Sequence, residues 1–334
     1  MSYSTAKVQI ELGNMQSRVT GDAPWGFLEE VFNRHLPGLV RDAGSRGVRV
    51  YDAETGQCLT GLVPALCDTL EGLGVHAVVR DHRPHLVRRH DWRLQEGIEL
   101  RDYQREVVET TLAAERGIVA AGTGAGKTII GAALIARLGV PTIWITTTRV
   151  LLRQTVQALR LALGYEPGVC GDGQWSPADI TVALVQAVER RPGAFPPGRF
   201  PLLIFDEGHH AAARTFCSVC LDLEPRRSYY LTAVPYRESD DQVVLDALTG
   251  GVVASVPSVD LIEKGWLCPL QVEFTPLRID GDMTEQPHGT LYRRFIVSRF
   301  FIFGCLFFVL AFSLFFSASS SSVGSFLDVH TASV

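Results

Sequence analysis

Short strand-like segments and one helical pattern occupy the first part of the chain. The strand-like segments cover residues 8–12, 48–51 and 75–79, and the helical pattern covers residues 63–73. Alternation of apolar and polar residues is typical of half-buried strands, whereas apolar residues three or four apart are typical of an amphipathic helix. Residues 1–95 therefore predict a small α+β module in the order strand, strand, helix, strand.

From residue 96 the pattern changes to apolar runs that alternate with helical segments. The runs predict strands at residues 117–120, 142–146, 180–184, 202–205 and 229–232, and the helical segments include 128–138 and 149–163. Strands that alternate with helices are typical of a parallel sheet, which binds its ligands at the carboxyl ends of the strands. The fold class predicted for residues 96–290 is therefore α/β, a parallel sheet flanked by helices.

The last part of the chain differs in composition from everything before it. Residues 300–316 are seventeen uncharged residues rich in phenylalanine, and a serine-rich tail without lysine or arginine follows to residue 334. Three interpretations stay open: a frameshifted or truncated gene, a short membrane anchor, or a helix packed on the α/β lobe. A membrane is expected as a partner only if the 300–316 run is genuine.

Composition limits the possible functions only broadly. The chain has 334 residues, 46% of them apolar and 20% charged, and a net charge of −5, which argues against a wholly basic nucleic-acid binder but allows a local basic groove. Residues 80–93 are such a basic stripe, either a nucleic-acid contact or a solvated connector. Seven cysteines without a paired framework and an N-terminus without a secretory signal favour the cytoplasm. Cys217 and Cys220 form a single CxxC, and we expect no structural metal there.

Residues 121–128 combine small residues with a lysine and a threonine. They follow the strand at 117–120 and open the helix at 128–138. In this context the backbone N–H groups and the helix N-terminus face a phosphate group, and the side chains of Lys127 and Thr128 reach the β/γ-phosphates and Mg²⁺. The predicted phosphate loop consists of Gly122, Thr123, Gly124, Ala125, Gly126, Lys127 and Thr128. One position departs from the strict motif, because Ala121 replaces its first glycine.

An acidic motif follows the strand at 202–205. Asp206 and Glu207 come directly after the strand, and Gly208, His209 and His210 continue the motif. At the carboxyl end of a strand, Asp206 is suited to hold Mg²⁺ and Glu207 to activate a water molecule. An acidic helix N-cap is the structural alternative. The two motifs together, in this order, predict a nucleoside triphosphate hydrolase that uses Mg²⁺.

The order of motifs resembles that of superfamily 2 helicases, most closely the XPB-like and UvsW-like branch and the ATPase subunits of type I and type III restriction enzymes. The resemblance covers about residues 95–297. It is carried by Arg-Asp-Tyr-Gln at 101–104, the phosphate loop, Asp-Glu-Gly-His-His at 206–210 and Leu-Thr-Ala-Val-Pro-Tyr-Arg at 231–237. It implies a RecA-like first motor lobe, with residues 291–299 as the start of a linker to a second lobe that is expected to be missing after a truncation. A phage or bacterial origin fits the resemblance, and the lobe alone is expected to have weak activity or none.

The resemblance also implies roles for individual residues. Arg101, Tyr103 and Gln104 are expected to bind the adenine, with Gln104 reading its edge. His209 and Thr232 are expected to couple the nucleotide site to strand movement, although Val234 stands where the family has threonine.

Three further residues are expected to contact DNA phosphates, and they are Thr147, Arg149 and Gln186. The module at 1–95 resembles the small domain that precedes the core in UvsW-like phage proteins, because Thr-Gly-Leu at 60–62 leads into its helix and residues 78–84 match. That similarity implies that the module holds DNA.

The resulting hypothesis is the first motor lobe of an ATP-dependent DNA helicase or translocase of the repair or recombination type. RNA stays open as the nucleic acid. Two alternatives remain: a nucleotide-dependent DNA-binding module without efficient turnover, and a restriction-enzyme ATPase subunit.

Overall fold

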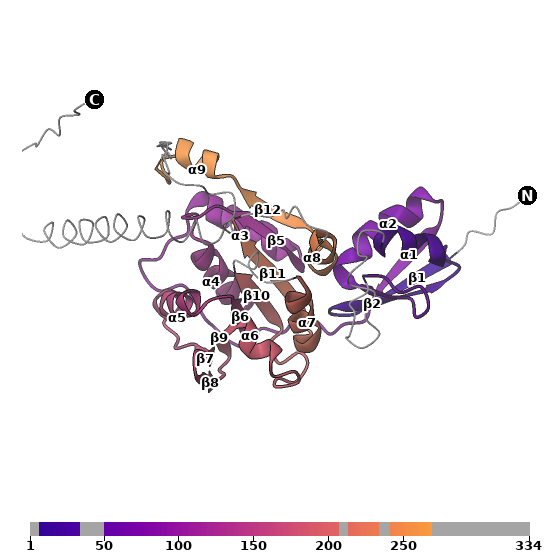
Figure 1. Cartoon of the computed structure of the whole chain (residues 1–334). Helices are drawn as coiled ribbons and strands as arrows, with labels where there is room; N and C mark the ends of the chain where they lie inside the picture. Colours follow the sequence, from indigo (N-terminus) through magenta and orange to yellow (C-terminus); the bar gives the residue numbers. More distant parts are fainter. Residues whose placement is uncertain (1–6, 34–49, 207–212, 234–240, 269–334) are drawn as a thin grey trace, which may run out of the picture. The chain divides into compact units, whose positions relative to one another are not determined.

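The structure is a computed structural model that describes residues 7–33, 50–206, 213–233 and 241–268 (Figure 1). These residues belong to one compact unit, Met1–Leu270, and they form two separate sheets. The predicted linker at 291–299 and the 300–316 run lie outside the described residues. Within the described ranges, no helix has both the length and the apolar character needed to cross a membrane.

The smaller sheet is built from four strands in the order β3-β2-β1-β4. β1 pairs antiparallel with β2 and parallel with β4. Its elements are β1 (Lys7–Leu12), β2 (Gln16–Gly21), α1 (Trp25–Asn33), β3 (Gln57–Leu59), the 3₁₀ helix η1 (Thr60–Leu62), α2 (Val63–Gly72) and β4 (His76–Asp81).

Only part of this smaller sheet was predicted. The segments at 8–12, 63–73 and 75–79 correspond to β1, α2 and β4, whereas β2, α1 and β3 were not expected. The strand predicted at 48–51 is wrong at residues 50 and 51, which the structure describes, because Tyr51 forms an isolated bridge with Cys58 and belongs to no strand. Residues 48 and 49 lie outside the described residues.

The larger sheet has eight strands in the order β12-β5-β11-β10-β6-β9-β7-β8. All neighbouring strands are parallel except the β7–β8 hairpin, so the predicted α/β fold is confirmed. Its elements are α3 (Asp102–Ala113), β5 (Arg116–Ala121), α4 (Lys127–Leu138), β6 (Thr142–Thr146), α5 (Arg149–Leu163), β7 (Gly168–Gly171), β8 (Gln174–Ser176), β9 (Ile180–Leu184), α6 (Val185–Glu189), β10 (Leu202–Asp206), α7 (Ala213–Leu223), β11 (Arg227–Thr232), α8 (Asp241–Thr249), β12 (Val252–Val256) and α9 (Ser258–Glu263).

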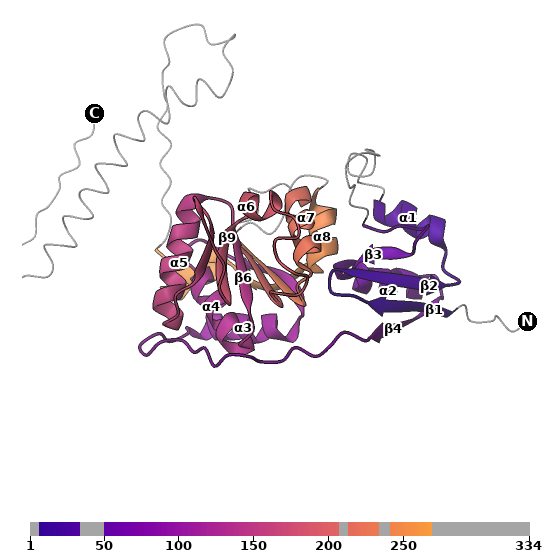
Figure 2. The same cartoon turned by 90° about the horizontal axis from the view of Figure 1, so that it is seen from below.

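Helices cover both faces of the larger sheet, which explains its continuous apolar strands. α3, α4 and α5 lie on one face and α6, α7 and α8 on the other (Figure 2). Successive residues of a strand point to opposite faces. In β10, Leu203 and Phe205 belong to the core under α7, whereas Leu202 and Ile204 belong to the core under α4. β10 therefore contributes apolar side chains to two cores.

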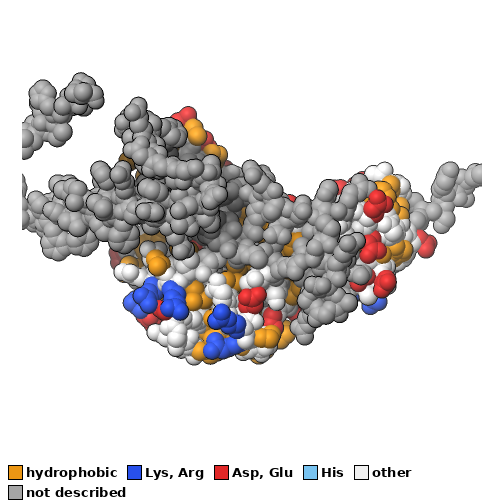
Figure 3. Space-filling view, viewed as in Figure 1, with side chains coloured by type: hydrophobic (Ala, Val, Ile, Leu, Met, Phe, Trp, Pro, Cys, Tyr) orange, Lys and Arg blue, Asp and Glu red, His pale blue; other side chains and the backbone are white. Residues whose placement is uncertain are grey.

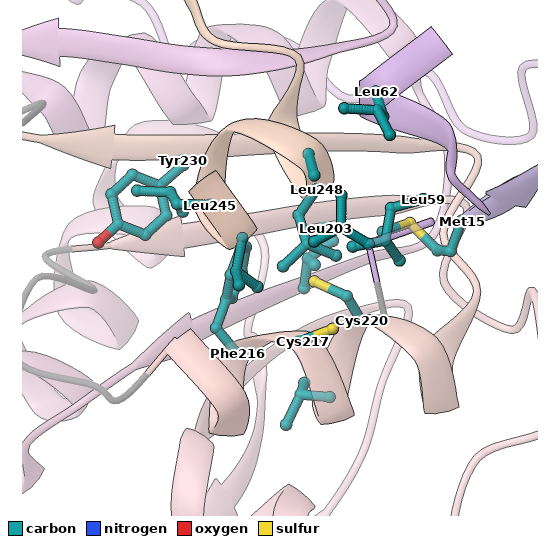
Figure 4. Packing of buried hydrophobic residues seen from close by; sticks show 14 of the residues in the cluster. Met15, Leu59, Leu62, Leu203, Phe216, Cys217, Cys220, Tyr230, Leu245 and Leu248 are labelled. Atoms are coloured by element: carbon teal, nitrogen blue, oxygen red, sulfur yellow. The ribbon is translucent and has the colours of Figure 1, made fainter. Parts of the chain in front are cut away.

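One of these cores continues into the smaller sheet. Met15, Leu59 and Leu62 pack in the same cluster as Leu203 and Leu248 of the lobe (Figure 4). The backbones also approach closely, because a Cβ atom at Gly61 of η1 would lie 2.4 Å from the Ala247 carbonyl oxygen of α8.

Cys217 and Cys220 lie inside this core on α7 as free thiols (Figure 4). Burial raises the pKa of the Cys217 thiol to about 12, and burial likewise raises the pKa of the Cys220 thiol. Thiols of this kind stay protonated and pack as small apolar side chains. Cys217 and Cys220 are three residues apart because both lie on the buried face of α7.

The basic stripe at 80–93 runs into an extended connector between β4 and α3. Arg88 pairs with Asp91 of the same connector at 3.2 Å, and His90 lies 3.2 Å from Asp179. Arg83 points inward, and only 7% of its side chain is exposed. These residues hold the connector along the lobe, so the stripe is in part structural.

Arg83 belongs to a cluster of two arginines and two carboxylates at the base of the lobe. Its Nη2 donates to Glu115 at 2.7 Å, and its Nε donates to Asp81 at 2.7 Å. Arg226 forms ion pairs with both carboxylates. Hydrogen bonds from Arg83 hold the pKa of Asp81 below its usual range. Burial alone would raise the pKa of Glu115, but the bond from Arg226 and the charge of Arg83 lower it.

We expect Glu115→Gln to destabilise the protein by about 2 kcal/mol at neutral pH, because it leaves two buried arginines to share Asp81. The cost is below that of a fully buried pair, since the Glu115 side chain is 35% exposed and partly screened. A carboxylate whose pKa is lowered by folding stabilises the folded state at pH values above its unfolded pKa. The difference in the free energy of unfolding between wild type and Glu115→Gln should therefore disappear as the pH falls below the folded pKa of Glu115. Urea unfolding from neutral to acid pH measures both effects.

Glu109→Gln is the matched control, on helix α3, which ends two residues before Glu115. Glu109 forms an ion pair with Arg137 at the surface, where both side chains are more than half exposed. We expect a much smaller loss of stability than for Glu115→Gln, because solvent and salt screen exposed ion pairs. Equal losses for the two substitutions would contradict a special role of the buried cluster.

Candidate functional site

The predicted phosphate loop connects the end of β5 to the start of α4. Gly124 has φ +84° and Gly126, the N-cap of α4, has φ +80°. These left-handed conformations suit glycine, which explains two of the glycines in the motif. Ala121 is the last residue of β5 and has no such backbone. A methyl group is therefore tolerated at the one position where the sequence departs from the strict motif.

Gln104 and Tyr103 fix the shape of this loop. The Ala125 carbonyl oxygen accepts hydrogen bonds from the Tyr103 hydroxyl at 3.0 Å and from Gln104 Nε2 at 3.1 Å. Gln104 Oε1 in turn accepts from the Arg101 backbone N–H at 3.0 Å. An amide group has two donors and two acceptor positions. Among the residues that the structure describes, one donor and one acceptor position of this buried amide thus have no partner and suit a ligand.

Lys127 and Thr128 lie in the first turn of α4, where both are half-buried. Lys127 Nζ donates to the Ala121 carbonyl oxygen at 3.2 Å, so the side chain folds back across the loop. Thr123 and Gly124, in the same loop, are exposed to solvent. The ammonium group therefore lies beside the backbone that a phosphate would approach.

Strand register places the remaining described residues of the predicted nucleotide site at the same edge. β11 lies between β5 and β10; its Thr232 pairs with Ala120, and its Leu231 pairs with Asp206. Asp206 is 5% exposed and Thr232 is buried completely. The predicted phosphate loop and Asp206 thus follow strands that are separated by one neighbour. Glu207 and His209 lie outside the described residues.

The segment around α9 covers this corner, which was not predicted. A Cβ atom at Gly122 would lie 2.3 Å from Ser258 Oγ, and one at Gly124 would lie 2.7 Å from Leu267 Cδ2. The Arg101 guanidinium lies 4.4 Å above the Trp266 ring. Residues at the far end of the lobe sequence therefore pack against both the loop and the predicted adenine corner.

The three predicted DNA-contact residues meet in one hollow at the carboxyl edge of the sheet. Thr147, Arg149 and Gln186 all line a cavity of about 660 Å³. Gln186 Nε2 donates to the Thr147 carbonyl oxygen at 3.4 Å, which joins the ends of the neighbouring strands β6 and β9. Thr148, just before Arg149, caps α5 by accepting from the Leu151 N–H at 3.2 Å. The structure thus brings together residues that lie almost forty positions apart in sequence.

The same hollow contains residues that sequence reasoning missed. They are Asp172 in the β7–β8 turn, Trp175 on β8, and Arg190 and Arg191 after α6. The Gly-Asp-Gly turn at 171–173 was an available hairpin signal, because all three residues have positive φ. The arginines carry no such signal, since two adjacent charges after a helix are common on any surface.

Comparisons with known proteins agree with this geometry. The family model of the type III restriction enzyme res subunit matches residues 97–237. The DNA 3′-5′ translocase XPB2 of Sulfurisphaera tokodaii is 32% identical over 160 residues, which cover 48% of this chain and 36% of that protein. The DNA 3′-5′ helicase XPB of Mycobacterium tuberculosis is 30% identical over 187 residues, which cover 53% and 34%. The matched region spans about a third of each relative.

The crystal structure of the UvsW helicase from bacteriophage T4 has the same fold. It superposes with a TM-score of 0.60 at 17% identity, over 74% of this chain and 99% of that one. The lobe resembles superfamily 2 helicases, XPB in sequence and UvsW in fold. The family resemblance read from the motifs is confirmed, and the helicase lobe is RecA-like.

We expect Gly126→Ala in the lobe to be more destabilising than Gly74→Ala, which lies between α2 and β4 of the smaller module. Both glycines have positive φ, +80° and +73°, so both substitutions place a methyl group in a left-handed backbone at a cost of about 1 kcal/mol. Only at Gly126 does the new Cβ meet an atom, Gln104 Nε2 at 2.4 Å, whereas Gly74 faces open space. Urea unfolding compares the two variants. Equal losses would mean that Gln104 moves aside without cost.

Proposed function

We propose that this chain binds ATP with Mg²⁺ and a DNA strand as the first motor lobe of an ATP-dependent DNA helicase or translocase in repair or recombination. The observation that carries the proposal is the common edge of the sheet. The predicted phosphate loop after β5, Asp206 at the end of β10 and the 660 Å³ hollow after β6 and β9 all open at carboxyl ends of parallel strands. Such edges are where open α/β sheets bind ligands.

The loop residues fit a triphosphate. Left-handed glycines at 124 and 126 turn the backbone tightly just before α4, which suits backbone N–H groups to an anion at the helix N-terminus. Lys127 supplies a positive charge beside them. Mg²⁺, when bound by Thr128 and Asp206, would neutralise charge on the phosphate oxygens.

Hydrolysis needs a base, and Glu207 follows Asp206 directly in sequence. We assign Glu207 the role of orienting and deprotonating the attacking water, as the motif implies. His209 and Thr232 are proposed to connect this chemistry to the DNA contacts. Thr232 supports that role because it lies on β11, between the strand of the phosphate loop and the strand of Asp206.

We expect Lys127→Ala to weaken binding of ATP·Mg²⁺ by about 10- to 100-fold, the loss typical of one charge-assisted hydrogen bond. Glu207→Gln should keep the affinity and abolish turnover. Titration of a fluorescent ATP analogue and a phosphate-release assay with and without DNA measure the two steps. Unchanged ATP affinity in Lys127→Ala would refute the proposed nucleotide site. If DNA changes neither the ATP affinity nor the rate of phosphate release, the proposed motor function would be refuted.

Gln104 provides a separate test of base recognition. Its free donor and acceptor positions can pair with the adenine edge, so Gln104→Ala should lower the preference for ATP over GTP by about tenfold. The affinity for inorganic triphosphate, which has no base, should change less. Competition of ATP, GTP and triphosphate against the same fluorescent analogue distinguishes these outcomes. An unchanged ATP preference would restrict Gln104 to its role in loop structure.

A further inference from the structure

The hollow that contains Thr147 and Gln186 is positively charged, although the whole chain carries a net charge of −5. Three arginines line it against a single aspartate. Lysine and arginine side chains gather in two groups on the side of the lobe that carries α5 and the β7–β8 hairpin (Figure 3). A local excess of positive charge on an acidic protein indicates a surface for an anionic ligand.

The aspartate is already engaged. Asp172 Oδ2 accepts from Arg153 Nε at 2.8 Å, and its Oδ1 lies 3.5 Å from Arg149 Nε. Neither Arg190 nor Arg191 forms an ion pair with any residue that the structure describes. Two of the arginine charges that line the hollow are therefore available to an external anion.

Arg191 is held in place by an aromatic column that begins in the core. Phe200 is completely buried and contacts Phe195 edge to face, with ring centroids 5.1 Å apart. Phe195 stacks on Trp175 at 5.4 Å with an angle of 17° between the rings. The Arg191 guanidinium lies 4.3 Å from the centroid of the Trp175 ring and completes the column.

This arrangement reduces the entropy that Arg191 loses on binding. A free arginine side chain loses conformational entropy when a ligand immobilises it. Stacking on an indole ring restricts the guanidinium before any ligand arrives, and its planar edge still offers donors that match two phosphate oxygens. The column thus prepares a phosphate-binding group at the wall of the hollow.

We propose that Arg191, positioned by Trp175, and Arg190 bind the phosphate backbone of the same DNA strand that Thr147, Arg149 and Gln186 are proposed to contact. The inference rests on the proposed function and extends the strand's path from β6 and β9 to the β7–β8 hairpin. Trp175 is a positioning residue, because both of its ring faces contact protein and it acts through Arg191.

The test is the binding of a fluorescent single-stranded oligothymidylate to the full chain, followed by anisotropy over a range of salt concentrations. Arg191→Ala should weaken binding about tenfold, and the log–log salt slope should fall by about 0.7 for one lost phosphate contact on a single strand. Arg191→Lys keeps the charge but not the planar fork, so it should lie between wild type and Arg191→Ala.

Trp175→Ala and Trp175→Phe separate positioning from charge. Trp175→Ala should weaken binding several-fold while the salt slope stays near the wild-type value, because no charge is lost. Trp175→Phe keeps a ring for the guanidinium and should restore most of the affinity. If Trp175→Phe binds as weakly as Trp175→Ala, Trp175 does not act through ring stacking.

Arg137→Ala is the matched control, since Arg137 is an exposed arginine in the last turn of α4, at the opposite edge of the sheet. It should bind within about twofold of wild type. Arg191→Ala behaving like Arg137→Ala, while wild type binds the strand, would overturn this inference and leave the proposed function standing. Failure of the wild-type chain to bind any nucleic acid would instead contradict the proposed function.

Discussion

Parallel pairing of β5, β11 and β10 is the constraint on which the rest of the lobe depends. Because parallel strands end at one edge, the loop after Ala121, the hydroxyl of Thr232 and the carboxylate of Asp206 come to the same side of the sheet. The pairing is possible only because helices bury both faces, which requires apolar side chains at successive positions. The apolar strands therefore determine where the polar residues of the site meet.

The same constraint explains which parts of the fold can be predicted from sequence. Strands buried on both faces are continuous apolar runs, and the predictions at 142–146 and 149–163 coincide with β6 and α5. β2 was missed because a polar residue occupies one of its buried positions. Ser17 is 2% exposed, and its hydroxyl is satisfied 2.9 Å away by Thr60, a partner forty-three positions later in the chain. Local periodicity contains no information about such a partner.

In the candidate site, too, some features could be predicted from the sequence and others could not. Motif order singled out Thr147, Arg149 and Gln186 as expected DNA contacts, and these residues line one hollow because the ends of parallel strands lie at one edge of the sheet. It did not predict that Gln104 holds the Ala125 carbonyl oxygen, or that Trp175 supports Arg191, since each contact joins side chains from separate elements. Contacts that depend on the relative placement of two elements become visible only in three dimensions.

Each end of α3 lies at a contact between separate elements. Gln104 in its first turn bonds to the predicted phosphate loop, and Glu115, just after its last turn, lies in the charged cluster with Arg83 of the connector. A helix of 12 residues is about 18 Å long and bends little over that distance. A shift of the loop that displaces Gln104 therefore cannot be absorbed along α3. A stiff element therefore joins the contact of Gln104 to the charged cluster beside the segment that leads to the smaller sheet.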